Sequence, residues 1–490
     1  MNIIKFLAVA VLPLLAVTAD GKGDSLRYEV ELSANASTGT YAPLWFTANR
    51  YGLSSERPNS GYLRAGAQYD TRFGHGWSLR AGLDLAGAVD HSAPFIVHQA
   101  YADLSWRVLT LSVGAKERGA FPLDKDMRLS SGAMVEGPNA GPIPQVRLEM
   151  KRYWDVPLTK GWLGVKGHIG YGMLTDGGWR KDFVAVGQRY SKNVVYHTKS
   201  LMLRVGNSDV FPLTMEIGML EAAQFGGSLW EKQADGSVKC VANMPNGVKD
   251  FFKALLPRQE STLENIDGNH TGSWNFALNY EAKTWGARLY YEHYFDDHSQ
   301  LTWQYGRWKD GQIGVEVTLP ANPFVTKVLW EGMNTTDQTG PILYDGVGGS
   351  FTDLQMSGRD NYYEHLTYPW THWGQNIGVP FVPGPAYGGD GKLVFTSNRV
   401  KTHHIGIGGD PSSEFAYRML LSFARHWGTY SVPFDKVCHQ NSMLFELTYK
   451  PKRLGGWRFV LGCGVDSGDY LGDSFGGMLT ISKSGILWAR

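Results

Sequence analysis

Apolar and polar residues alternate along many short segments of this chain. Between residues 78 and 89, for example, Leu79, Leu83 and Leu85 alternate with Arg80 and Asp84. The same period of two recurs at residues 100–107, 165–173, 274–281, 284–291, 417–424, 443–450 and 457–465. A period of two places successive side chains on opposite faces of a strand. The pattern therefore predicts an all-β protein built from many strands.

Two features of these segments favour a barrel in a membrane over a soluble β-sandwich. The opposite face carries Arg, Asp, Glu or small residues, whereas a sandwich needs both sheets to supply one apolar core. Aromatic residues also cap the apolar face near strand ends, as rings do at a membrane interface. They are Trp106, Trp274, Tyr280, Trp285, Tyr417, Tyr449 and Trp457. We therefore expect a transmembrane antiparallel β-barrel, and tilted strands of roughly 10 residues allow about 16–18 of them.

The start of the chain has the pattern of a signal peptide, residues 1–19. Lys5 precedes an apolar run from Phe6 to Val17 that is too short to cross a bilayer as a helix. Small residues at 17–19 suit a signal peptidase. We expect export, a mature chain that begins near Asp20, and a single barrel domain over residues 20–490.

The connections between the predicted strands differ greatly in length. Long ones are expected at about residues 116–146, 222–272 and 332–400. Within the second, Val248 to Leu256 is predicted to form a short amphipathic helix, which ends before Pro257. Connections longer than about 15 residues are usually functional or disordered.

Composition narrows the classes of function. The 60 glycines and 13% aromatic residues are typical of many strands, tight turns and interfacial rings. A formal net charge of +1 without a long basic block makes nucleic acid an unexpected partner. No segment after residue 20 is apolar enough to be a membrane helix, which leaves a closed barrel as the structure that satisfies the backbone in lipid. The three cysteines give no disulfide framework, and pairing of Cys240 with Cys438 stays open.

An ordered series of short motifs runs along most of the mature chain. They are Tyr41–Phe46 with Ala48–Gly52, Leu129–Gly132 with Asn139–Ala140 and Pro142–Gln145, Gly268–Ser273, Asp360–His365 with Trp370 and Gly374, and Gly378–Pro380 with Asn398–Val400. Together they resemble the Wzi family of capsule-assembly outer-membrane proteins. The resemblance implies a barrel of about 18 strands in a Gram-negative outer membrane. It further implies a lectin, not an enzyme, that helps to attach capsular polysaccharide at the cell surface. The implied partners are capsular or other surface polysaccharide, outer-membrane lipid and the barrel-assembly machinery, and a monomer is expected.

The best candidates for glycan binding lie in the third long connection. Tyr362, Tyr363, Tyr368, Trp370 and Trp373 offer flat faces for sugar C–H groups. Arg359, Asp360, Asn361 and Gln375 offer hydrogen bonds to hydroxyls or to an acidic sugar. The alternative is that these rings belong to the interfacial girdle or pack the loop against the barrel mouth.

Charged residues on the inward face predict a network inside the barrel. Its members are Arg80, Asp84, Arg107, Arg288 and Glu446. Such charges cost little free energy in a large barrel when water or partners reach them. The network either plugs the lumen or lines a pore, and the second alternative would make the protein a porin-like channel for sugars or small anions.

Catalytic and metal-binding residues are not predicted. The pairs Asp296–Asp297 and Asp124 with Asp126 have the residue type that glycoside chemistry needs, but both lie in turn-like stretches where Asp is common. His403 and His404 are neighbours on a predicted strand and so point to opposite faces, which argues against a shared ion. No cofactor is expected.

Overall fold

The computed structural model describes residues 23–254, 268–296, 309–338, 340–341, 355–356 and 361–490, so the predicted signal peptide lies outside the described chain. The described strands form a closed, 18-stranded antiparallel β-barrel. The barrel closes because the first strand, β1 (Ser25–Ser37), pairs both with β2 and with the last strand, β26 (Ser474–Ala489). The predicted barrel is therefore confirmed.

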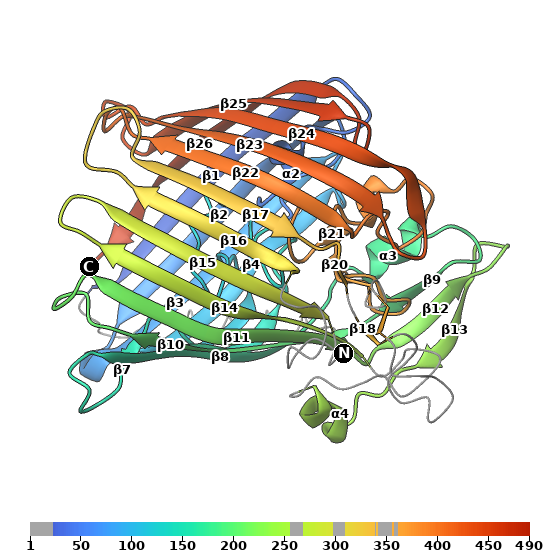
Figure 1. The fold of residues 1–490 in the computed structure, drawn as a ribbon, viewed down its shortest axis with the longest axis horizontal. Coiled ribbons are helices and arrows are strands. Elements are labelled where there is room, and N and C mark those ends of the chain that lie inside the picture. Colours follow the sequence, from blue (N-terminus) through green and yellow to red (C-terminus); the bar gives the residue numbers. More distant parts are fainter. Residues whose placement is uncertain (1–22, 255–267, 297–308, 339, 342–354, 357–360) are drawn as a thin grey trace.

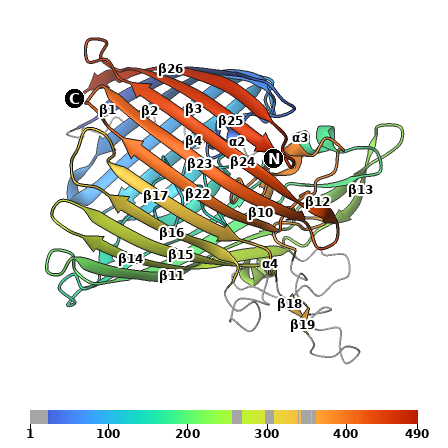
Figure 2. The ribbon, with the colours of Figure 1, turned by 45° about the horizontal axis from the view of Figure 1, so that its top comes forward.

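Each wall strand pairs with its neighbours in sequence order, and Figure 2 shows the strands crossing the wall obliquely. The remaining wall strands are β2 (Asn59–Arg72), β3 (Trp77–Val89), β4 (Phe95–Trp106), β5 (Leu109–Ala115), β6 (Gln145–Met150), β8 (Leu163–Met173), β10 (Val195–Val205), β11 (Leu213–Phe225), β14 (Asn269–Glu281), β15 (Gly286–Asp296), β16 (Gly311–Thr318), β17 (Lys327–Asn334), β22 (Val400–Gly409), β23 (Phe415–Gly428), β24 (Pro433–Tyr449) and β25 (Trp457–Gly468). A short strand, β7 (Trp154–Asp155), also pairs with β8.

The two rims of the barrel differ in the length of their connections. The rim where β1 begins and β26 ends has short turns, such as residues 73–76 and 107–108. The opposite rim has connections as long as residues 116–144 and 335–399. We call them the short-turn rim, marked by the C-terminus in Figure 1, and the long-loop rim. In bacterial outer-membrane barrels the short turns face the periplasm and the long loops face outward.

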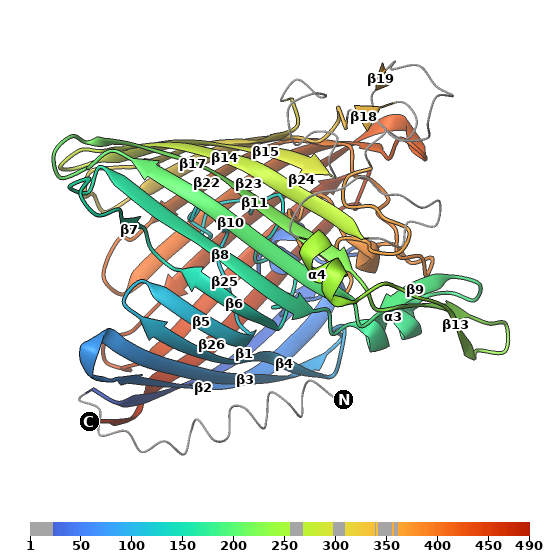
Figure 3. The same ribbon diagram turned by 90° about the horizontal axis from the view of Figure 1, so that it is seen from below.

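The smaller elements lie in the connections. They are the helices α2 (Leu44–Thr47), α3 (Gly177–Phe183) and α4 (Val248–Lys253), the 3-10 turns η1 (Gly74–Gly76) and η2 (Pro385–Tyr387), the sheet of β9 (Arg189–Lys192), β12 (Ser228–Lys232) and β13 (Val238–Asn243), and the pairs β18 (Gly340–Pro341) with β19 (Gln355–Met356) and β20 (Thr371–His372) with β21 (Gln375–Asn376). Helix α4 begins at the predicted residue, and residues 255–256 of the predicted segment lie outside the described chain. The β9–β12–β13 sheet projects beyond the long-loop rim (Figures 1 and 3). None of the described helices is long and apolar enough to span a membrane.

The wall is apolar outside and polar inside. On the outer face, Leu63, Leu83 and Leu461 expose 55%, 49% and 59% of their surface. On the inner face, Asp103 and Arg147 expose only 1% and 2%. A belt of exposed apolar side chains is unfavourable in water and matches the lipid-facing band of a membrane barrel.

Aromatic side chains mark the edge of this belt at the short-turn rim. Outward rings lie there in pairs from adjacent strands, such as Trp77 with Trp106 and Phe415 with Tyr449. Their ring centroids are 6.1 and 4.6 Å apart, respectively. Amphipathic rings prefer the boundary between lipid and water. The belt and its aromatic edge support a location in an outer membrane.

Candidate functional site

Three connections of the long-loop rim fold into the lumen. We call residues 38–58 the first plug segment, residues 116–144 the second and residues 361–399 the third. Side chains from all three, including Trp45, Met134 and Tyr362, meet in one buried apolar cluster. The cluster also contains inward-facing wall residues such as Leu329 and Leu420, so the plug and the wall share one core.

A buried lysine fixes the second plug segment to the wall. Lys125 Nζ donates to Glu292 Oε2 on β15 at 2.8 Å, to the carbonyl of Gly132 at 2.8 Å and to the side chain of Gln312 on β16. The other carboxylate oxygen of Glu292 accepts the Met134 N–H at 2.9 Å. Both charged side chains are 1% exposed. Removing one partner of such a buried pair strongly destabilises the folded protein.

A second buried carboxylate holds the Leu129–Gly132 motif. Glu331 on β17 accepts the Ser130 hydroxyl at 2.7 Å and the Ser131 N–H and hydroxyl at 2.7 and 2.6 Å. Nearby, the carbonyl of Leu129 lies 2.6 Å from Nε2 of His404 on β22. The motif therefore acts as a docking element between the plug and the wall.

The first and third plug segments are fixed in the same way. The Leu44 N–H donates to Asp466 of β25 at 3.0 Å, and Arg50 pairs with Glu446 of β24 at 3.3 Å. In the third segment, the Tyr362 hydroxyl donates to Asp310, just before β16, at 3.0 Å.

The plug segments also bind one another. The Tyr51 N–H donates to the carbonyl of Pro138, which joins the first and second segments. The Trp370 indole N–H donates to the carbonyl of Val135 at 2.9 Å, and the Gly137 N–H donates to that of Ile377 at 3.0 Å. The three segments therefore form one packed body.

Four members of the predicted lumen network lie on the wall strands in polar contacts. Arg80 pairs with Asp70 at 2.5 Å, and Asp84 accepts Arg64 Nε at 2.6 Å. These two pairs join β2 and β3.

The other two wall residues of that prediction contact the plug. Arg288 donates to the carbonyls of Leu123 and Asp124, the latter at 3.2 Å. Glu446 accepts Arg418 Nε at 2.9 Å as well as Arg50. The contacts form local pairs along the wall, and those of Arg288 and Glu446 hold the plug.

The prediction that Arg107 faces the lumen is wrong. Strand β4 ends at Trp106, so Arg107 lies in the turn to β5, at a φ of 54°. Its exposed guanidinium lies 5.0 Å from the centroid of the Trp106 ring. The alternating pattern continues one residue beyond the end of β4, into the turn.

The structure overturns the glycan-binding prediction for four aromatic residues. Tyr362, Tyr363, Tyr368 and Trp370 are 0%, 1%, 0% and 0% exposed, respectively. A ring without an exposed face cannot stack on a sugar. These rings instead form the interior of the third plug segment. This agrees with the alternative that the rings pack the loop.

The polar candidates of the same region have different positions. Asn361 is partly exposed, and its side-chain oxygen accepts Asn398 Nδ2 at 2.7 Å. Gln375 is buried on β21. Arg359 and Asp360 lie outside the described residues.

Trp373 is the one predicted aromatic candidate that keeps part of its surface exposed. It lies in the turn between β20 and β21, at a φ of 53°. A non-glycine residue rarely adopts this left-handed conformation, which persists only where the surroundings enforce it. Here the Trp373 N–H donates to Asp176 Oδ2 at 3.0 Å. The structure therefore holds this indole at the surface at a conformational cost.

A buried ion pair positions that turn. Arg180 of α3 donates through Nε to Asp176 at 2.9 Å, and both side chains are almost fully buried. The same guanidinium donates to the Ser191 hydroxyl on β9 at 2.9 Å and to the carbonyl of Thr371 on β20 at 2.8 Å. One arginine therefore joins α3, β9 and the β20–β21 hairpin.

Two aromatic residues that the sequence reasoning missed lie beside the turn. Trp179 and Phe183 are four residues apart on α3, and their rings stack at 4.7 Å between centroids. The Trp179 ring lies against Gly374, where a Cβ would come within 2.5 Å of it. Both rings are partly exposed. We call Trp179, Phe183 and Trp373 the aromatic face; the spacing of Trp179 and Phe183 was the signal that could have revealed it.

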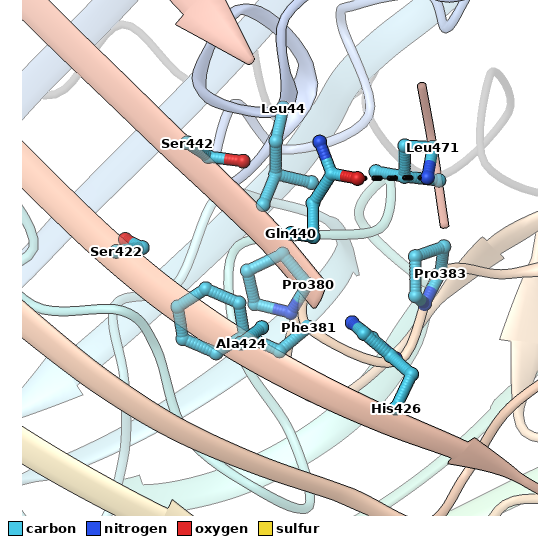
Figure 4. Close-up of a pocket in the computed structure, with 10 residues that line it drawn as sticks. All are labelled: Leu44, Pro380, Phe381, Pro383, Ser422, Ala424, His426, Gln440, Ser442 and Leu471. Atoms are coloured by element: carbon cyan, nitrogen blue, oxygen red, sulfur yellow. Dashed lines mark hydrogen bonds between the residues drawn. The ribbon is translucent and has the colours of Figure 1, made fainter. Parts of the chain in front are cut away.

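Small cavities remain within the packed body. One, of about 40 Å³, is lined mainly by the second plug segment, including Lys116, Arg118 and Glu136. Another, of about 10 Å³, is shown in Figure 4, where Leu44 and Phe381 face Ser422 and Ser442 of the wall. A single water needs about 10–15 Å³, so both cavities are of water size, not sugar size.

The described residues form no group of three or more His, Cys, Asp or Glu side chains arranged for a metal ion. His404 is buried in the lumen, whereas His403 is exposed on the outer face. The three cysteines are free, so Cys240 and Cys438 are not joined. Asp297 lies outside the described residues, and Asp296 is buried.

Comparison with known proteins supports the fold. No protein-family model matches the sequence, and no curated protein matches it either. Among solved structures, the chain is similar to Wzi of Escherichia coli, an outer-membrane protein involved in group 1 capsule assembly and a carbohydrate-binding β-barrel. The TM-score is 0.56 and the identity 11%, over 97% of this chain and 87% of that one. OprD of Pseudomonas aeruginosa gives a TM-score of 0.47 at 9% identity, over 96% and 98% of the two chains. OccAB4 of Acinetobacter baumannii gives 0.49 at 10%, over 96% and 99%. At this identity, the likeness to Wzi shows an outer-membrane type of barrel and nothing finer.

Proposed function

We propose that this protein is a non-enzymatic, plugged outer-membrane barrel that binds capsular or other surface polysaccharide and supports its attachment to the cell. The ligand would bind at the long-loop rim, on the aromatic face of Trp179, Phe183 and Trp373. The barrel would be folded and inserted by the barrel-assembly machinery and would act as a monomer.

The conformation of Trp373 is the observation that carries this proposal. A left-handed tryptophan, in a turn held by the buried Asp176–Arg180 pair, keeps its indole partly exposed. Strain that the surroundings enforce is a pointer to function. Trp373 precedes Gly374, which the Trp179 ring contacts, and partly exposed indoles match the flat, apolar faces of sugar rings.

The plug favours binding over transport. Three segments that share a core with the wall occupy the lumen, and buried carboxylates fix them in place. Under the alternative of a porin-like channel, this body would have to move for each solute to pass. A fixed plug instead provides a rigid support for the aromatic face above it. The carbohydrate-binding function of Wzi is consistent with this proposal.

A binding titration tests the proposal. Purified protein in detergent is titrated with polysaccharide from the surface of the parent bacterium, and binding is followed by calorimetry. Replacing a central aromatic anchor commonly costs about 2 kcal/mol, so Trp373→Ala should weaken binding roughly 30-fold.

The matched control is Trp162→Ala, at the opposite rim, where the indole is also exposed. Its affinity should equal that of the wild type. Equal affinities of Trp373→Ala and the wild type would remove the aromatic face as the site. Trp370→Ala is unsuitable as a test, because that ring lies in the core of the plug.

A further inference from the structure

A row of basic side chains crosses the outside of the barrel near the long-loop rim. Lys401 on β22 is directly opposite Arg425 on β23, which is directly opposite His439 on β24. All three side chains are exposed, whereas the next residues along the strands, Thr402 and Gln440, are buried toward the lumen. The row therefore lies on the outer face.

This arrangement is unfavourable without an anion. The Lys401 ammonium and the Arg425 guanidinium are directly opposite each other on neighbouring strands, and like charges in this position repel. In the described part of the chain, no carboxylate forms an ion pair with Lys401, Arg425 or His439. The nearby carboxylate of Asp469 pairs with Lys436 at 2.8 Å and accepts the backbone N–H of His439 at 2.6 Å.

An indole adds a second feature to the row. The Lys401 ammonium and the Arg425 guanidinium each lie 5.9 Å from the centroid of the Trp427 ring. Tryptophan at this level is typical of the boundary between lipid and water. The ring partly offsets the repulsion between the two cations.

The row lies at the edge of the apolar belt. Phe423 and Met443, outward residues near the row on β23 and β24, are exposed apolar side chains of the belt. Arg425 is two residues beyond Phe423 along β23, which is about 7 Å at the usual rise of a strand. The cations are therefore placed at the depth of lipid headgroups in the leaflet on the long-loop side.

The geometry points to a binding site for the phosphate of an anionic membrane lipid, formed by Lys401, Arg425 and His439 with Trp427 beside them. A lipid fits this position better than a soluble anion, because its acyl chains would lie along the apolar belt below the row. Its phosphate would supply the negative charge that the row lacks. This site is distinct from the aromatic face, and its existence does not depend on the proposed function.

Native mass spectrometry of the full-length protein in dodecyl maltoside tests this inference. The wild type is incubated with phosphatidylglycerol or with phosphatidylcholine of the same acyl chains, and the bound lipid is counted. We expect the wild type to retain phosphatidylglycerol preferentially. In Lys401→Gln/Arg425→Gln its apparent affinity should fall roughly 30-fold, as expected for two cationic groups near a membrane surface.

Arg107→Gln is the matched control, because Arg107 is an exposed cation over Trp106 at the opposite rim. It should retain the lipid as the wild type does. Equal retention in the double variant, equal loss in Arg107→Gln, or equal binding of phosphatidylcholine would each overturn the inference. Displacement of the lipid by millimolar inorganic phosphate would also overturn it, because the site would then bind a free anion.

The double variant should fold, since removing opposed like charges relieves repulsion. Heat-modifiable gel mobility checks this directly. A thermal scan gives a second readout: phosphatidylglycerol should raise the melting temperature of the wild type but not that of the double variant. Equal shifts in the two proteins would contradict the site.

Discussion

Replacing Lys125 with methionine should loosen the second plug segment without altering the wall. Methionine has a similar length but leaves Glu292 buried without its cation, and it removes the hydrogen bond to Gly132. Breaking a buried pair by removing one partner costs about 3–5 kcal/mol. Because the Met134 N–H donates to the same carboxylate, the loss should appear as local opening of this segment.

Hydrogen exchange measured by mass spectrometry tests this prediction. If the lost free energy appears in local opening, exchange at Met134 should accelerate about 100- to 4,000-fold, since each 1.4 kcal/mol is a factor of ten. Lys452→Met, at an exposed position, is the control and should exchange as the wild type does. Lys125→Met/Glu292→Gln should recover most of the protection, because no buried charge is then unpaired. Unchanged exchange in the single variant, or a double variant as loose as the single one, would refute this reasoning.

Three further predictions concern the plug and the aromatic face. Burial raises the pKa of Glu364 from 4.5 to about 7, so its protonated form is favoured in the folded plug; the plug is then weakened as pH rises from about 4.5 to 7. Residues 361–399 should therefore resist protease better at pH 5 than at pH 8. Glu364→Gln should abolish this difference, because its amide oxygen still accepts the Phe395 N–H but the side chain cannot ionise. A difference that persists in this variant would contradict the role of Glu364. Arg180→Met should lower the free energy of unfolding by about 3 kcal/mol, because it strands the buried Asp176 carboxylate, whereas the exposed Lys181→Met should not; equal denaturation midpoints would argue against this role. In planar bilayers the wild type should carry no steady current, and a steady current from it would favour the channel alternative.

The wall could be predicted from sequence because each strand separates two environments at every step. Leu83 and Asp84 are neighbours, and the structure exposes the first on the outer face and buries the second on the inner face. Such alternation is local, so it is visible without knowledge of the fold. It fails at its ends, as Arg107 shows, since a turn and a strand differ there by only one residue.

The plug could not be predicted in the same way, because its contacts are long-range. Ser131 and Glu331 are 200 positions apart, and nothing local indicates that they meet. Composition was also ambiguous: a loop rich in aromatic rings fits an exposed sugar platform and a buried core equally well. The structure buries Trp370 in the core of the plug and leaves Trp373, in the turn between β20 and β21, partly exposed.

The fraction of surface polysaccharide that stays with the cells after washing tests the central claim most directly. It is measured in the parent bacterium, in a strain lacking this gene, and in that strain complemented with the wild type, Trp373→Ala or Trp162→Ala. We predict that the deletion strain makes and exports polymer but releases it, and that the wild type and Trp162→Ala restore attachment whereas Trp373→Ala does not. Normal attachment in the deletion strain would contradict the account.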